Sequence, residues 1–310
     1  MRRRHLVVRM RDRLTDPSSR TIRRFLTGLW IASIVGVMGF AAYLTIVGGI
    51  DVPQVREDRT IGDYALPAAL SFAAQYVDAT LGMGYGTTLS ALLIMLGFPA
   101  RQVVVAVLLQ QLVAGGIASI AHHALGNADL ERGSPHFRLA MLLGAMGIAG
   151  GFIAATVAIS LPERTLDGAV GAVILVMGVV IFVARHIRLK FSWWRAAVLG
   201  LLAGANKGFM GGGYGPLIVA GQMVIGDTMR HAIAVTALAE ALSCVGGIVG
   251  YVILGAQMPW VLTASLLVGG IVASLFAAAT VRVIPAQGLK SIIGAVYLLL
   301  GALTLYASLT

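Results

Sequence analysis

Long apolar stretches separated by short polar loops make up most of the chain after residue 24. The first stretch covers 25–50, and a polar loop at 51–65 follows it. A helix of about 20 apolar residues crosses the hydrocarbon core of a bilayer. The pattern therefore predicts an all-α polytopic membrane protein with an N-terminal transmembrane anchor at 25–50 and an extracytoplasmic loop at 51–65. Eight further apolar segments lie at about 66–96, 102–126, 139–160, 166–184, 196–226, 231–254, 259–280 and 286–309.

Charged residues are scarce and unevenly distributed. They make up 12% of the 310 residues, about half the share expected of a soluble protein. The formal net charge is +10, and nine arginines lie in residues 1–24, before the first apolar stretch. By the positive-inside rule we interpret this stretch as a basic cytoplasmic tail whose partners are anionic membrane lipids rather than nucleic acid. The expected location is the inner membrane of a bacterial cell, with a cytoplasmic N-terminus.

Signatures of enzymes and of bound metals or cofactors are missing from the sequence. The chain has one cysteine, Cys244, which excludes an internal disulfide and a CxxC zinc motif. HExxH, GxSxG and P-loop patterns are also missing. His122, His123 and His231 fall at expected helix ends, where we interpret them as polar caps rather than metal ligands. We therefore predict a protein that is not an enzyme and has no cofactor or metal.

A glycine-dense break interrupts the apolar segment 196–226. Residues 206–216 read NKGFMGGGYGP, with five glycines and a proline in the last nine positions. Non-helical backbone at membrane depth is tolerated only where it packs against protein or lines a water-filled cavity. The break is thus either a tight packing point or the lining of a binding site.

The break has a counterpart earlier in the chain. Shifted by 129 residues, 82–86 (GMGYG) falls on 211–215 (GGGYG), and Arg101 falls on Arg230. Residues 66–126 then show 13 identities in 61 positions. Internal symmetry of this kind is typical of secondary transporters. We predict two transporter repeats, at 66–186 and 195–309.

The distribution of basic residues favours inverted repeats. The N-terminal tail is left out of the following counts. If each glycine-broken segment crosses the membrane, five basic residues lie on the cytoplasmic side and eight on the extracytoplasmic side. If each is a re-entrant hairpin, the counts become nine and four, so the positive-inside rule favours hairpins. Each repeat then has one hairpin and three transmembrane helices. An odd number of crossings makes the repeats inverted.

Asp78 and Lys207 are intramembrane charges at equivalent positions of the two repeats. Such charges usually face a partner or a cavity. An ion pair between the two that locks the hairpins together is one interpretation. The other is that Lys207 binds an anion together with N–H groups at the helix N-termini beside the glycines. The substrate-binding candidates in this second interpretation are Lys207, Asn206, Gly84, Tyr85, Gly86, Gly213, Tyr214 and Gly215.

Glu240 is a further intramembrane carboxyl group. It shares a helix face with Thr236, and the repeat places Gln111 at its position in the first half. Glu240 could be protonated and inert, or it could carry a coupling proton, because desolvation favours the neutral form of a carboxyl group. We assign proton coupling to Glu240 and Asp78, and we add Thr236 and Gln111 to the substrate-binding candidates.

These motifs resemble the TauE/SafE sulfite exporter family over about residues 66–308. Residues 211–216 resemble the glycine-rich turn of the family, and 234–237 (AVTA) resemble the helix start that follows it. Residues 78–87 and 125–129 resemble a subgroup with a GMGYG turn and a later GN-x-D loop. The sequence departs from the family at Val107 and Gln111, where a small hydroxyl residue and a glutamate are usual.

The resemblance implies a membrane carrier of small sulfur-containing anions such as sulfite, sulfonates or sulfoacetate. The principal hypothesis is a proton-coupled exporter in which the two halves move to give alternating access. A passive anion channel and a non-transporting membrane partner of a sulfur-metabolism enzyme are the alternatives. The sequence is compatible with a homo-oligomer and leaves the substrate, its direction and the coupling ion open.

Overall fold

The computed structural model describes residues 60–184, 190–224 and 227–281, with a few isolated positions nearer the termini. Every regular element in these ranges is a helix, and α5, α6, α10 and α11 are long and apolar enough to cross a membrane. The prediction of an all-α polytopic membrane protein is confirmed. The expected anchor at 25–50 and the last expected crossing at 286–309 lie outside the described ranges. The elements are η1 (Ile61–Tyr64), α3 (Ala65–Leu81), α4 (Tyr85–Met95), α5 (Ala100–Ala124), α6 (Pro135–Ser160), α7 (Glu163–Ala184), α8 (Trp193–Met210), α9 (Tyr214–Val224), α10 (Met229–Ile253) and α11 (Trp260–Thr280).

Glycines end α3 and α8 and begin the short helices that follow. Gly82 and Gly84 have φ angles of 72° and 129°, and Gly211 and Gly213 have φ angles of 75° and 80°. Residues with a Cβ rarely adopt such angles, whereas glycine adopts them without steric cost. The two breaks are thus specified locally by the sequence.

The helix pair α3–α4, called the first hairpin below, enters and leaves on one side of the bundle. The ring of Tyr64, just before α3, packs against that of Phe98, just after α4, with 6.0 Å between centroids. Near the far end of α3, Gln75 accepts a hydrogen bond from Gln110 in the middle of α5. Because α3 and α5 begin on the same side, α4 must return the chain to that side.

The pair α8–α9, called the second hairpin, is built in the same way. Lys207 near the end of α8 contacts Glu240 in the middle of α10. Gln222 near the end of α9 donates to the carbonyl of Ala232 near the start of α10. The chain therefore comes back to the side from which α10 begins.

Contacts between the long helices show that the two hairpins enter from opposite sides. Successive contacts show that α3 and α5 both run parallel to α11. In the same way, α8 and α10 both run parallel to α6. Where the two groups meet, Leu108 of α5 lies beside Gly247 of α10, and Gly115 beside Ala237, so α5 and α10 run antiparallel. Inverted repeats require these opposed directions. Which side faces the cytoplasm stays a prediction.

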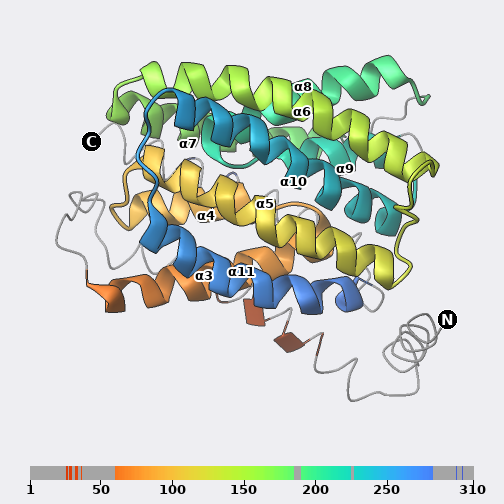
Figure 1. Cartoon of the computed structure of the whole chain (residues 1–310), viewed down its shortest axis with the longest axis horizontal. Coiled ribbons are helices and arrows are strands. Elements are labelled where there is room, and N and C mark those ends of the chain that lie inside the picture. The colour runs from red at the N-terminus through yellow and green to blue at the C-terminus, as the bar shows by residue number, and fades with distance from the viewer. Residues whose placement is uncertain are drawn as a thin grey trace.

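Helix bounds follow the spacing of the sequence repeat. Shifted by 129 residues, the bounds of α4 and α5 coincide with those of α9 and α10. Figure 1 shows the long helices stacked side by side, with α8 and α6 at one edge, α10 and α5 in the centre, and α3 with α11 at the other edge. This arrangement places the α5–α10 contact in the middle of the protein.

Candidate functional site

The tips of the two hairpins touch through glycine. A Cβ added to Gly86 would overlap the carbonyl oxygen of Gly211, and one added to Gly215 would overlap that of Gly82. These contacts are equivalent under the repeat, because Gly86 corresponds to Gly215 and Gly82 to Gly211. The glycines thus let the two backbones approach to direct contact in the interior of the protein.

Lys207 of α8 and Glu240 of α10 form a buried ion pair. Their Nζ and Oε1 atoms are 2.6 Å apart, and the side chains are 0% and 7% exposed. A charged group in such a place needs a partner, because desolvation of an isolated charge costs several kcal/mol or more. The ion pair that the sequence suggested, between Lys207 and Asp78, is not the one that forms.

Asp78 is held by its own repeat instead. Its Oδ1 accepts from the backbone N–H of Tyr85, at 3.2 Å, and its Oδ2 accepts from the side-chain amide of Gln111, at 3.4 Å. The first of these contacts places a carboxylate at the N-terminus of α4, where the helix dipole favours negative charge. The carboxylate of Asp78 therefore occupies the kind of position that the sequence analysis assigned to a bound anion.

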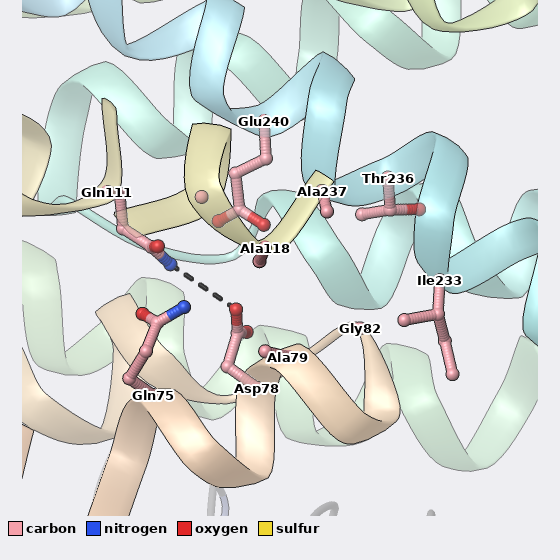
Figure 2. Close-up of a pocket in the computed structure, with 11 residues that line it drawn as sticks. Gln75, Asp78, Ala79, Gly82, Gln111, Ala118, Ile233, Thr236, Ala237 and Glu240 are labelled. Carbon is pink, nitrogen blue, oxygen red and sulfur yellow. Dashed lines mark hydrogen bonds between the residues drawn. The ribbon is translucent and has the colours of Figure 1, made fainter. Parts of the chain in front are cut away.

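A small cavity lies between α3, α5 and α10. Figure 2 shows Glu240 and Gln111 extending toward Asp78 across this space. The volume open to the centre of a water molecule is about 10 Å³, so the cavity has room for about one water molecule. The cavity is therefore closed to a sulfonate in this conformation. It is lined by Gln75, Asp78, Ala79, Gly82, Gln111, Gly115, Ala118, Ile233, Thr236, Ala237 and Glu240.

The cavity extends toward one side of the protein. Ala118 lies toward the end of α5 and Ile233 near the start of α10, and both line the cavity. Because α5 and α10 are antiparallel, these two positions lie on the same side. The repeat relates the cavity-lining residues Ala79, Ala118 and Ala237 to Gly208, Gly247 and Leu108 on the opposite side. These three residues are in close contact, so the equivalent space on that side is filled.

The structure brings four of the predicted site residues together around the cavity, namely Asp78, Gln111, Thr236 and Glu240. Lys207 joins them through Glu240. Thr236 also accepts a hydrogen bond from Gln222. Gln75 and Gln222 were not predicted, although a buried amide in an apolar helix is a signal that could have pointed to them.

The remaining predicted residues lie at the hairpin tips or beside them. Tyr85 and Tyr214 are fully buried, and their hydroxyl groups bond Ser71 and the carbonyl of Leu143, respectively. Asn206 is half-buried on α8 and does not line the cavity. The last of the set, Gly84, Gly86, Gly213 and Gly215, form the breaks and the contacts between them.

Comparisons with known proteins agree with a transporter. The family model described as "Sulfite exporter TauE/SafE" matches residues 67–304. The chain is 26% identical over 260 residues to the "Probable membrane transporter protein YtnM" of Bacillus subtilis (strain 168), which covers 77% of this chain and 81% of that protein. It is 25% identical over 202 residues to the "Probable membrane transporter protein YdhB" of the same organism, which covers 61% and 82%. No solved structure matches.

Proposed function

Because the chain belongs to the sulfite exporter TauE/SafE family, we propose that this multi-pass membrane transporter exports small sulfur-containing anions in a proton-coupled cycle. The proposed substrates are sulfite, sulfonates and sulfoacetate. The bacterial inner membrane, with the N-terminus in the cytoplasm, is the proposed location. The observation that carries the proposal is the buried Lys207–Glu240 ion pair beside the cavity.

Lys207 supplies the positive charge that an anion needs in the membrane interior. Its ammonium group is fully buried and is neutralised by Glu240 at 2.6 Å. When Glu240 takes up a proton, the charge of Lys207 is left without a counter-ion. A substrate anion then restores neutrality, because an unpaired charge in a low-dielectric site is unfavourable. Anion binding and proton binding are coupled in this way through the charge of the site.

The second hairpin is also better suited than the first to bind an anion. In the first hairpin, the carboxylate of Asp78 accepts a hydrogen bond at the N-terminus of α4. The equivalent position before α9 carries Lys207, whose ammonium group cannot accept a hydrogen bond. The N-terminus of α9 therefore combines a positive helix dipole with a lysine, and both favour a negatively charged ligand.

Transport requires a movement that this conformation does not show. The cavity is too small for a sulfur oxyanion and extends toward one side only. If the two repeats exchange conformations, the cavity closes and its repeat-related position opens toward the other side. The residues lining that second cavity would include Lys207, Glu240, Cys244 and Gly247, the counterparts of Asp78, Gln111, Gly115 and Ala118.

Flux measurements in proteoliposomes test this function. We expect saturable movement of radiolabelled sulfite or a sulfonate, driven by an imposed pH gradient. Lys207→Met should abolish the flux, whereas Lys190→Met, which alters an exposed lysine, should leave it unchanged. Flux that does not saturate and ignores the pH gradient would instead identify a passive channel. No flux of any sulfur oxyanion above that of empty vesicles would refute the substrate class.

A further inference from the structure

Three potential metal ligands meet at one end of the bundle, and none of them lines the cavity. His136 lies in the first turn of α6, Asp227 in the connection between α9 and α10, and His231 in the first turn of α10. One ligand atom from each residue lies within 4.8 Å of the others. This set of three residues is called the His–Asp–His cluster below.

The two imidazole rings are close, and that of His231 already contacts the carboxylate of Asp227. Their centroids are 4.4 Å apart, with an interplanar angle of 47°. The Nδ1 atom of His231 is 3.1 Å from Oδ1 of Asp227, and both side chains are partly exposed. Among the described residues, the structure records no hydrogen bond to the ring nitrogens of His136. The ligand atoms are therefore accessible and need only small movements to face one point.

We propose that the His–Asp–His cluster binds a divalent transition-metal ion, with Zn²⁺ as the principal candidate. Two imidazole nitrogens and one carboxylate oxygen are ligands that zinc accepts in a tetrahedral site, with water in the fourth position. Each histidine would coordinate the metal through a ring nitrogen that carries no proton, and any proton displaced from that nitrogen is released to solvent. This site is independent of the proposed substrate.

Local charge is compatible with a cation at this position. Asp227 provides the negative charge of the cluster. Arg132, Arg138 and Arg230 are the basic residues nearest in sequence, and all three are exposed to solvent, where their charge is screened. The N-termini of α6 and α10 disfavour a cation, but coordinate bonds to three ligands outweigh this modest effect.

The metal would link α6 to the returning end of the second hairpin. The backbone N–H of Asp227 donates to the carbonyl of Gln222 on α9, at 3.2 Å. Gln222 in turn donates to Thr236, which lines the cavity. Metal binding therefore braces the connection through which the second hairpin leaves the bundle, and it should stabilise the fold.

Metal binding is best measured on the full-length protein in detergent, purified with a tag that contains no histidine. The probes are Zn²⁺ and Co²⁺, and Co²⁺ reports its coordination through its visible absorption spectrum. We expect about one metal ion per chain after buffer exchange, a tetrahedral Co²⁺ spectrum, and a rise in the melting temperature on addition of Zn²⁺.

His136→Ala, Asp227→Asn and His231→Ala should each weaken binding by about tenfold or more, since even the loss of an outer partner costs that much. His123→Ala, which removes a histidine at another helix end, is the matched control and should bind as the wild type does. The melting temperature of each variant without metal shows that it is folded. Wild-type protein that binds no Zn²⁺ at micromolar concentrations, or cluster variants that bind it normally, would overturn the proposal.

Discussion

The side chain of Lys207 contacts Glu240 at 2.6 Å, and its repeat counterpart Asp78 contacts Gln111 at 3.4 Å. Glu240 and Gln111 are themselves equivalent under the repeat, so the side chain of each hairpin contacts the equivalent helix position within its own repeat. Both pairs are separated by 33 residues in the chain. The chemistry of the two pairs differs, because the hairpin carries an anionic side chain in the first repeat and a cationic one in the second. This asymmetry places the buried ammonium group of Lys207 in the second hairpin, at the point where we propose that an anion binds.

The ion pair should contribute to stability as a unit. Lys207→Met and Glu240→Gln each leave a buried polar or charged group without its partner, and loss of one partner of a buried ion pair costs about 3–5 kcal/mol. The double variant should recover most of this loss, because no charge then stays unpaired. Thermal unfolding of the four proteins in detergent measures the coupling. Single variants as stable as the wild type would show that the pair contributes nothing.

Coupling to protons should depend on Glu240. A glutamine at this position cannot exchange a proton, so Glu240→Gln should move the anion at a rate that no longer responds to a pH gradient. Asp78→Asn is the variant for comparison, because it removes the other carboxyl group that lines the cavity. That group contacts Gln111, whereas Glu240 forms the ion pair with Lys207. Uptake by proteoliposomes with and without the gradient provides the measurement. A Glu240→Gln protein that still accumulates anion against its gradient at the expense of protons would exclude this role.

Contact between the hairpin tips should tolerate no side chain. In Gly86→Ala and Gly215→Ala, the new Cβ would overlap backbone of the opposite hairpin, and overpacking of this kind costs about 1–3 kcal/mol or more. Gly116→Ala is the matched control, because nothing lies within 4 Å of a Cβ at that position of α5. We expect a lower melting temperature and poorer monodispersity for the first two variants only. Equal stability of all three proteins would contradict the close contact.

Cys244 should report the exchange of the repeats. Its thiol is fully buried in this conformation, but its counterpart in the first repeat, Gly115, lines the cavity. Alkylation by N-ethylmaleimide should therefore be slow at rest and faster when substrate and a pH gradient drive the cycle. The positive control is Ala237→Cys in a Cys244→Ala background, because Ala237 lines the cavity and is partly exposed in the present conformation. A rate for Cys244 that never changes under transport conditions would argue against exchange of the repeats.

The glycine breaks could be predicted from the sequence because they depend on local backbone conformation. Gly82 and Gly211 adopt φ angles that other residues avoid, so the positions of the glycines in the sequence locate the ends of α3 and α8. Long apolar runs likewise predict membrane helices, since length and hydropathy are local properties. The shared spacing of 129 residues also related α5 to α10 before their contacts were known.

Partner choice in the interior was decided by tertiary structure alone. Repeat symmetry identifies Asp78 and Lys207 as equivalents, but equivalent residues touch only where they lie on the symmetry axis. Packing of α8 against α10 instead directs Lys207 to Glu240, and packing of α3 against α5 directs Asp78 to Gln111. The His–Asp–His cluster depends in the same way on packing, which brings His136 at the start of α6 to Asp227 and His231 at the start of α10. The sequence by itself determined where the helices break and repeat, whereas the way the helices pack decided which charges meet.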